Sequence, residues 1–397
     1  ERDRQHTETS TMNFLPTEEQ RMAVEGFTRF LETELRPIVE RYQPDKLIEK
    51  EVMLEIFQKM LPYGMGGNGI IAEEHGGLGM PWLTYALMYE QLARISGDVA
   101  ISLLIQQLGA YSLEVCTNVA MREKYLPRMV RAEIIACSGI SEPGVGSNVA
   151  EVTCRAQRDG DHYIVTGEKT WISNGHYSDF CMVIVRTSQE GSGAISMILV
   201  DRAEHGYESR NIDKLGLNST STAQLFFDGA RVPAENMMIE PGTGLKNTMV
   251  LFEKARPMVG MTSIGIAQAA LDKAVAYSKE RRQHGKPIGG HQLIQGMLAE
   301  AATELDAARL LVYRAFNLID HGVRSEVQSA MAKWYATEIA VNVASKALQI
   351  HGGNGITKDF GVELLFRNAR MMPIPDGTTE IQKLIIGRAL TGINAFS

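Results

Sequence analysis

One acidic side chain, Asp376, lies in the segment MPIPDGTTEIQ (372–382), between a rigid Pro-x-Pro and the start of an apolar helical pattern. A carboxylate there can cap the following helix by accepting hydrogen bonds from its first free N–H groups. Thr378 or Thr379 could do the same before Ile381. The other interpretation is a catalytic carboxylate. Taken alone, the segment favours the cap, because turn chemistry is much commoner than catalysis.

The composition limits the class of protein. The chain has 397 residues and is 44% hydrophobic, which suffices for a large core in two or three cooperating domains. A net charge of -7 without a block of Lys or Arg argues against nucleic acid or an anionic membrane as the principal partner. No apolar run is long enough to cross a bilayer, so we expect no membrane span.

The cysteines and histidines carry no metal signature. Cys116, Cys137, Cys154 and Cys181 are scattered without C-x-x-C spacing, and no H-E-x-x-H pair occurs among the histidines. We therefore expect no metal site and no disulfide scaffold, and a reducing compartment fits best. The stretch before Met12 lacks the apolar core of a secretory signal, and we expect it to be an added remnant.

Hydrophobic periodicity divides the chain into three parts. Residues 12–125 carry helical periodicity, whereas 126–240 contain closely spaced β-rich runs such as HYIVTGEKTWIS and FCMVIVRT. From 241 to 397 long helices return, and one apolar stripe is formed by Ala330, Trp334, Val341, Ala344 and Leu348. We predict an α+β fold, mainly α, with an N-terminal helical domain, a middle β-barrel or sandwich domain and a C-terminal four-helix bundle.

A glycine-rich run, GMGGNG at 64–69, formally satisfies the dinucleotide-binding pattern G-x-G-x-x-G. That motif requires a preceding strand and a following helix, so that the N–H groups of the helix meet a pyrophosphate. Here the preceding segment has a helical pattern and the following one is too rich in glycine. We therefore predict a turn, and an NAD-dependent enzyme is not indicated.

Two other segments combine turn formers with groups that suit a planar ligand. In SGISEPGVGSN (138–148), small residues permit close backbone approach, and Ser141 and Ser147 supply hydroxyl groups. In GEKTWISNG (167–175), Trp171 could flank an aromatic ring and a nearby serine hydroxyl could meet a ring nitrogen. The alternative for the tryptophan is a cross-strand position in the β core.

Together these segments resemble the acyl-CoA dehydrogenases, flavoproteins that oxidise acyl thioesters at the α,β bond. That family has a T-E-P-G-A-G-S-D loop before a G-x-K-x-W-I-(T/S)-N-G strand and turn. Further similar segments follow in family order: KLGLNSTSTAQLFFDGARVPAEN, ERRQHGKPI, QIHGGNGI and PDGTTEIQKLIIGR. The resemblance covers nearly the whole chain.

The resemblance implies FAD as the cofactor, an acyl-CoA as the substrate, and the role of catalytic base for Asp376. It implies flavin contacts from Ile140, Ser141, Ser147, Trp171, Ser173, Thr378 and Glu380. It assigns the adenosine pyrophosphate of a neighbouring subunit's FAD to Arg281, Gln292, Gln349, Gly352 and Gly353, and it implies a further cofactor contact from His284. It assigns the substrate to Ser147, Phe252, Arg256 and Gly377.

The same resemblance implies electron-transferring flavoprotein as the electron acceptor and a homotetramer as the assembly. It implies the cytoplasm of a bacterium, or the mitochondrial matrix if the source is eukaryotic. Other functions on this scaffold are an acyl-CoA oxidase, an enoyl-CoA reductase and a non-catalytic acyl-CoA-binding homologue.

Several positions depart from the family pattern. Asn148, Asn218 and His284 replace its usual Asp, Arg and Phe, and Asp376 replaces its Glu. In some branches the base lies on another helix, at the position that Ala255 fills here, which argues against that alternate site.

Arg256, on the same helix, matches a family active-site arginine. The structural alternative for it is an ion pair with Glu253 at i,i+3 spacing. Glu253 is also the remaining competitor for the role of base.

The shorter acid bears on the substrate. An Asp carboxylate lies roughly 1.5 Å, about one C–C bond, behind the reach of Glu. Either Pro375 helps the loop to advance the acid, or a bulky or ring-bearing acyl group presents its α hydrogen nearer the base. We favour the second explanation. The apolar run Leu103–Ile105 suggests a pocket floor without a charge for a dicarboxylic tail, so we expect neutral branched, alicyclic or short to medium acyl chains.

Overall fold

This computed structural model describes residues 15–42, 44–188 and 194–395, so the expected remnant before Met12 lies outside the described residues. The N-terminal part is helical, with α1 (Glu18–Phe30), α2 (Arg36–Val39), α3 (Lys50–Met60), α4 (Trp82–Ile95), α5 (Gly97–Glu114) and α6 (Val119–Val130). The middle part contains β1 (Ala136–Gly139), β2 (Arg155–Asp159), β3 (His162–Ser173), β4 (Phe180–Arg186), β5 (Ile195–Asp201), α7 (Arg202–His205), β6 (Glu208–Asn211) and β7 (Thr222–Pro233). The C-terminal part contains α8 (Gly244–Glu280), β8 (Arg282–Gln283), β9 (Lys286–Pro287), α9 (Gln292–Asp320), α10 (Glu326–His351), α11 (Val362–Met371) and α12 (Thr379–Thr391).

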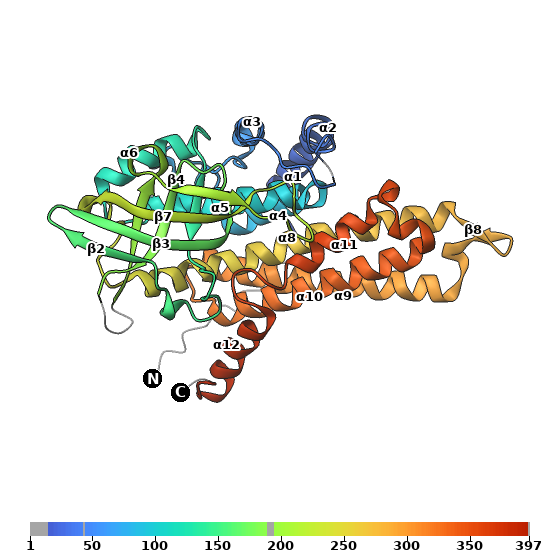
Figure 1. Cartoon of the computed structure of the whole chain (residues 1–397). Coiled ribbons are helices and arrows are strands. Elements are labelled where there is room, and N and C mark those ends of the chain that lie inside the picture. Colours follow the sequence, from blue (N-terminus) through green and yellow to red (C-terminus); the bar gives the residue numbers. More distant parts are fainter. Residues whose placement is uncertain (1–14, 43, 189–193, 396–397) are drawn as a thin grey trace, which may run out of the picture.

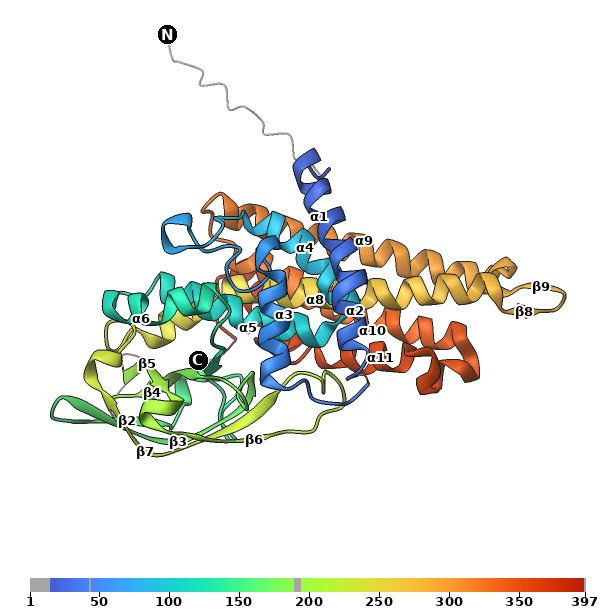
Figure 2. The ribbon, with the colours of Figure 1, turned by 90° about the horizontal axis from the view of Figure 1, so that it is seen from above.

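One curled sheet carries the middle part, with strand order β1–β4–β2–β3–β7–β6 and β5 paired to β4 (Figure 2). Strand β4 is buried along almost its whole length, as its continuous apolar sequence indicates. Its side chains alternate between two cores because successive residues of a strand point to opposite faces. Phe180, Met182 and Ile184 pack into the large core that the helices share, and the residues between them pack into a second core within the sheet.

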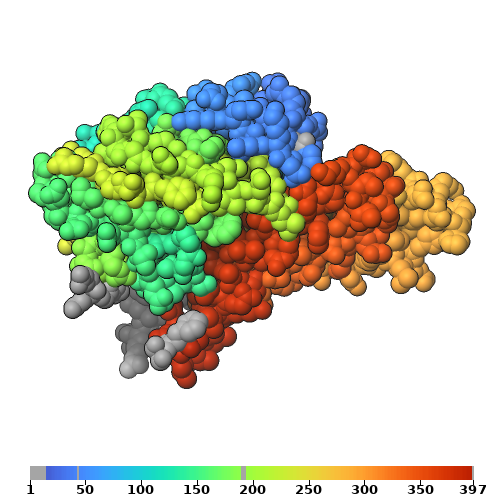
Figure 3. Space-filling model, viewed as in Figure 1, coloured from blue at the N-terminus to red at the C-terminus, as the bar shows by residue number. Residues whose placement is uncertain are grey.

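Helix α8 is the axis of the C-terminal part and packs against α4, α5, α9, α10 and α11. The sheet lies at one end of the molecule, and the long helices extend to the β8–β9 hairpin at the other end (Figure 1). Figure 3 shows the same arrangement in space-filling form, with the end of the helical part projecting beyond the body. The predicted helical, β, helical fold class is confirmed, whereas the domain boundaries at 125 and 240 stay predictions.

Two sequence interpretations can be compared directly with the fold. Residues 64–69 form a buried turn that follows helical structure, so the dinucleotide motif is absent from this segment and the predicted turn is confirmed. On α10, Ala330 and Ala344 of the predicted stripe are fully buried, and the three larger members are half-buried. Among the residues that the structure describes, no helix is both long and apolar enough to span a bilayer.

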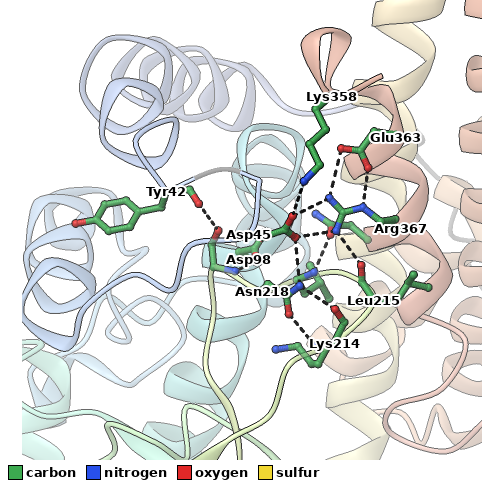
Figure 4. Close-up of polar contacts among 12 residues, drawn as sticks. Tyr42, Asp45, Asp98, Lys214, Leu215, Asn218, Lys358, Glu363 and Arg367 are labelled. Carbon is green, nitrogen blue, oxygen red and sulfur yellow. Dashed lines mark hydrogen bonds and ion pairs between the residues drawn. The ribbon is translucent and has the colours of Figure 1, made fainter. Parts of the chain in front are cut away.

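The three parts of the chain are joined by a polar network (Figure 4). Asp45, between α2 and α3, accepts hydrogen bonds from Arg367 of α11 at 2.8 Å and from Asn218 of the β6–β7 loop at 3.2 Å. Arg367 also donates to the Leu215 carbonyl oxygen at 2.8 Å and to Glu363 at 2.6 Å. The side chain that departs from the family pattern at 218 therefore links the β part to the N-terminal helices.

We expect Arg367→Met to lower the Tm and the free energy of unfolding by about 1–2 kcal/mol, because it removes charged hydrogen bonds between separate parts of the chain. The matched control is Arg36→Met. Arg36 makes the same kind of two-point pair with Glu32, at 2.6 and 3.0 Å, but only within its own helical segment. This control should stay within about 0.5 kcal/mol of wild type. Stability is measured by thermal and by denaturant unfolding. If Arg367→Met and Arg36→Met lose the same amount of stability, Arg367 does not join the parts of the chain.

Candidate functional site

Asp376 lies in a short loop, 373–377, between α11 and α12. Its φ of +55° is left-handed, a conformation that the short polar side chain of Asp tolerates better than most residues do. Gly377 follows with φ +88°, and a Cβ atom there would lie 2.7 Å from Nε2 of Gln382. The loop therefore requires glycine at 377 and holds Asp376 in an uncommon backbone conformation.

The cap of α12 is Thr378 and not Asp376. The side-chain oxygen of Thr378 accepts a hydrogen bond from the N–H of Ile381 at 3.5 Å. Within the described residues, neither the carboxylate nor the backbone N–H of Asp376 has a hydrogen-bond partner. The carboxylate of Asp376 therefore takes no part in the helix cap that the sequence alone favoured.

Two buried cations act on Asp376. Burial raises the pKa of this carboxyl above its ordinary value, and the positive charges of Lys333 and Arg256 oppose that rise. Lys333 is fully buried on α10, and Arg256 is buried on α8. Within the described residues Arg256 forms no ion pair, and its Nε atom is buried without a hydrogen-bond partner. Asp376 is thus a carboxylate on which two buried positive charges act.

Glu253, the competing carboxylate on α8, is bound elsewhere. It accepts hydrogen bonds from the backbone N–H and from Oγ of Ser325, the latter at 3.0 Å, at the start of α10. It therefore does not pair with Arg256, and the ion-pair interpretation of that arginine is wrong. The guanidinium of Arg256 instead lies 5.6 Å from the ring centre of Phe252.

One aromatic side chain of α4 feels the charge of the acid and contacts both α5 and α8. Tyr89 of α4 is fully buried, and its hydroxyl donates to the Ala100 carbonyl oxygen at 2.5 Å and contacts Oγ1 of Thr262 on α8 at 3.0 Å. Burial raises the pKa of Tyr89, and the charge of Asp376 raises it further. The expected pocket-floor residue Leu104 is also buried in α5. Tyr89 therefore joins α4 to α5 and α8 at a point within reach of the charge of Asp376.

Trp171 lies at a β-bulge. The register between β3 and β7 shifts between Lys169 and Ile172, and Trp171 has a left-handed φ of +62°. Because a bulge redirects its side chain, the indole is 62% exposed and does not pack in the sheet core. The core interpretation of this tryptophan is therefore wrong, and its ring is free to flank a ligand.

The loop at 138–148 lies beside the same strand. The N–H of Thr170 donates to the Ser141 carbonyl oxygen at 2.9 Å. Ile140, Ser141 and Ser173 are half-buried, whereas Ser147 is exposed. The structure thus places the loop of Ile140 and Ser141 beside the end of β3 that carries Trp171 and Ser173, with Ser147 further along the loop.

A buried ion pair fastens this loop, and the sequence analysis missed it. Nζ of Lys169 donates to Oε1 of Glu142 at 2.8 Å and to the Ile140 carbonyl oxygen at 3.0 Å. Glu142 also accepts hydrogen bonds from Thr153 and from the Cys154 N–H. Burial acts to raise the pKa of Glu142, but Lys169 and these hydrogen bonds together lower it. The only sequence signal was one acid in SEPG and one lysine in GEKTW, in two separate motifs.

A second site lies at the far end of α8. A pocket of about 780 Å³ is lined there by Arg281, His284, Gln292, Gly352 and Gly353 among others. Gly352 has φ +59°, and a Cβ atom there would meet nothing within 4 Å, so its backbone is open to a ligand. Gln349 is exposed on the last turn of α10 but is not a lining residue. The structure therefore gathers four of the five residues predicted for the adenosine pyrophosphate, together with the predicted cofactor residue His284.

Three family models match successive parts of the chain. They are the acyl-CoA dehydrogenase N-terminal domain over residues 17–133, the middle domain over 137–230 and the C-terminal domain over 242–391. The chain belongs to the acyl-CoA dehydrogenase family. It is accordingly an oxidoreductase, and FAD is its cofactor.

Relatives and solved structures agree with this assignment. Cyclohexane-1-carbonyl-CoA dehydrogenase of Geobacter metallireducens is 36% identical over 76% of this chain and 80% of its own length. Butyryl-CoA dehydrogenase from Megasphaera elsdenii is 32% identical, with a TM-score of 0.90 over 96% of this chain and 100% of that one. A chain from a structure described as the electron transferring flavoprotein of Acidaminococcus fermentans has a TM-score of 0.91 at 32% identity, with the same coverage.

The buried pair of the flavin-side loop gives a pH-dependent prediction. Lys169→Met leaves the Glu142 carboxylate buried and unpaired, which should cost about 3–5 kcal/mol at neutral pH. Without the lysine, burial raises the pKa of Glu142 in the folded state above its unfolded value. The variant's defect should therefore shrink as the pH falls and grow as it rises.

The measurement is the Tm of wild type, Lys169→Met and the double variant Lys169→Met/Glu142→Gln across a pH series. The double variant should recover part of the loss because it buries no charge. A Tm difference that is independent of pH, or a double variant no better than the single one, would show that the ion pair is not what fastens the loop.

Proposed function

We propose that this chain oxidises an acyl-CoA to the 2-enoyl-CoA, with Asp376 as the catalytic base. The observation that carries the proposal is the free carboxylate of Asp376, which is held near two buried cations and is not used by the helix cap. Such a group can accept the weakly acidic proton α to a thioester, provided that it is ionised and close. Burial alone would neutralise it, so Lys333 and Arg256 keep its basic form available.

The proton side of the reaction needs only residues of this chain. Asp376 takes the α proton, and the charge that develops on the thioester oxygen requires nearby donors. The unpaired N–H of Asp376 is one candidate donor, since no described acceptor uses it. Arg256 adds a fixed positive charge, with Phe252 packed against its guanidinium. Gly377 contributes its conformation, which a side chain would prevent.

The flavin side is supported by the geometry at the end of β3 and in the adjoining loop. When bound, FAD supplies the acceptor for the hydride that leaves the β carbon. Ile140, Ser141, Trp171 and Ser173 would hold its ring system, because the bulge leaves the indole exposed beside their loop. Ser147 would lie nearer the pantetheine or phosphates. Thr378 and the exposed Glu380 would contribute from the start of α12.

We further propose that the second pocket holds the adenosine pyrophosphate of a neighbouring subunit's FAD. The sheet and the β8–β9 hairpin, whose residues help to line this pocket, lie at opposite ends of the molecule (Figure 1). From Arg256 in the proposed site to Arg281 at this pocket, the chain follows α8 for roughly 37 Å. One dinucleotide cannot reach both sites in one chain, so each complete site needs two copies. This supports an obligate oligomer, for which we propose a homotetramer.

We propose electron-transferring flavoprotein as the physiological acceptor. The support is the close match to a chain from a structure described by that protein's name, together with the family resemblance. The exposed indole of Trp171 beside the proposed flavin site gives electrons a route to the surface. A soluble bacterial cytoplasm is the compartment in which we expect this exchange.

For the substrate we propose a neutral ring-bearing acyl group. The Asp carboxylate is one methylene shorter than Glu, so a bulky acyl group that brings its α carbon closer would suit it. A relative at 36% identity is a cyclohexane-1-carbonyl-CoA dehydrogenase. Tyr89, Leu103 and Leu104 are buried and uncharged, so none of the three offers a positive charge to a dicarboxylic tail.

The first prediction concerns the base. Asp376→Asn should keep its fold and its flavin absorbance, because Thr378 makes the cap, but it should turn over acyl-CoA roughly 10²–10⁴-fold more slowly. Glu253→Gln is the control for the competing acid. We expect it to lose some stability at Ser325 and to keep its turnover. Normal turnover in Asp376→Asn with a dead Glu253→Gln would move the base to α8.

The second prediction concerns substrate choice. On wild type, kcat/KM should be higher for cyclohexane-carbonyl-CoA than for butyryl-CoA and glutaryl-CoA. Asp376→Glu should shift that preference toward straight chains, because the longer acid no longer needs the bulky group to close the gap. If the longer acid changes all three values by the same factor, the missing methylene does not set specificity.

Acyl-CoA oxidase and enoyl-CoA reductase activities are tested with the same preparations. A dehydrogenase should pass electrons to electron-transferring flavoprotein without releasing peroxide in air. Rapid peroxide release would favour the oxidase. Reduction of the enoyl-CoA with no measurable acyl-CoA oxidation would favour the reductase, and flavin that no acyl-CoA bleaches would favour a non-catalytic homologue.

A further inference from the structure

A buried lysine closes the loop that carries Asp376. Nζ of Lys333, on α10, donates to the Pro373 carbonyl oxygen at 2.8 Å and to the Gly377 carbonyl oxygen at 2.9 Å. These two carbonyls stand at the two ends of the 373–377 loop. One side chain from a different helix therefore fixes the width of the loop whose apex is the proposed base.

The loop is also held from α12, on its other side. Nε2 of Gln382 donates to the Gly377 carbonyl oxygen at 2.8 Å and to the Asp376 carbonyl oxygen at 3.2 Å. The N–H of Thr379 donates to the Pro373 carbonyl oxygen at 3.1 Å. Gln382 and Thr379 both belong to α12, the helix that directly follows the loop. Of these three donors, Lys333 alone is a cation, and it alone comes from another helix, α10.

Burying the ammonium group of Lys333 costs more free energy than a purely structural contact requires. Its side chain is fully buried, and a buried ammonium loses its hydration without the full return of an ion pair. Within the described residues it forms no ion pair, and both of its hydrogen bonds go to neutral carbonyl oxygens. A neutral donor could make the same two bonds, so the positive charge needs another explanation.

That explanation is the charge of the neighbouring acid. Burial lowers the pKa of Lys333 to about 8, while the negative charges of Asp376, Glu338 and Glu380 act to raise it and Arg256 acts to lower it. In turn, Lys333 has a larger effect than Arg256 in lowering the pKa of Asp376 against the rise caused by burial. The lysine and the acid therefore stabilise each other's ionised forms across the loop.

We propose that Lys333 is a positioning residue for the reaction: by bridging the Pro373 and Gly377 carbonyl oxygens from α10 it fixes the shape of loop 373–377, and it places a positive charge beside the proposed base. This inference rests on the proposed function, in which Asp376 is the base. It assigns Lys333 no contact with substrate or flavin. Both effects act through the carboxylate.

The test isolates the proton step from the hydride step. Phenylacetyl-CoA has acidic α hydrogens and a ring carbon in the β position, so the holoenzyme cannot dehydrogenate it. In D₂O the base removes an α proton, exchanges it with solvent and returns a deuteron to the same carbon. Mass spectrometry of the recovered thioester measures this exchange rate as a function of pH, without any change in the flavin.

Three variants separate position from charge. Lys333→Met removes both donors and the charge, and it should slow exchange by about 100-fold, the scale expected for a misplacement of about 1 Å. Lys333→Gln keeps two N–H donors and removes the charge, so it should retain more of the rate at high pH. In both variants the acid limb of the pH profile should move to higher pH, because the pKa of Asp376 is no longer held down.

The matched control is Lys346→Met on the same helix. Nζ of Lys346 lies 3.0 Å from Glu300 and 3.2 Å from Glu304 of α9, so this change removes an interhelical lysine without touching the loop. It should leave the exchange rate and the acid limb at their wild-type values. An equal loss in Lys346→Met would show that the effect of Lys333→Met is a general weakening of α10.

Two outcomes overturn the inference. The first is a Lys333→Met protein with the wild-type exchange rate and acid limb. The second applies if Lys333→Met does not fold, in which case a Lys333→Gln profile that matches wild type is decisive.

Asp376→Asn distinguishes this failure from failure of the proposed function. If Asp376→Asn still exchanges normally, the proposed base is wrong. If it is inactive while the Lys333 variants match wild type, only the role of Lys333 is wrong.

Discussion

An ionised carboxylate must stay near apolar surroundings and yet remain free of hydrogen bonds, and the other features of this site follow from that constraint. Desolvation favours the protonated form, which could not accept a proton from a substrate. Two buried cations, one on α8 and one on α10, oppose the protonation of Asp376. These two helices must therefore be fixed relative to the α11–α12 loop. The close packing of α8 with α10 and α11 provides that fixed frame.

The sheet has a different role: it holds a large aromatic ring in an exposed position on a rigid strand. A bulge in β3 turns Trp171 outward, and the buried pair of Lys169 and Glu142 fastens the adjoining loop. Asn174 anchors the end of the same strand, since its Nδ2 donates to the Ser102 carbonyl oxygen of α5 at 3.0 Å. The two family motifs thus contain both the proposed ligand contacts and the side chains that hold them.

Much of this could be predicted from the sequence, and the remainder has a physical reason. Strand β3 coincides with the predicted run because its apolar residues and turn signals are local. The residues of the pocket at Arg281 could be predicted only from the family motifs, since they are far apart in the chain. The roles of Lys169 and Lys333 were missed because a lysine within a strand or helix is normally exposed. The left-handed φ of Asp376 depends on contacts from two other helices, which no local pattern encodes.

The most direct test of the central claim is the rate of flavin bleaching when the oxidised holoenzyme meets cyclohexane-carbonyl-CoA without oxygen. If Asp376 removes the α proton in the step that oxidises the substrate, deuterium at the α carbon must slow the bleaching in a stopped-flow experiment. The same deuterium should change the rate of wild type at every pH at which the carboxylate is ionised. Bleaching at an unchanged rate with the α-deuterated thioester, while β-deuteration slows it, would contradict proton removal as part of that step.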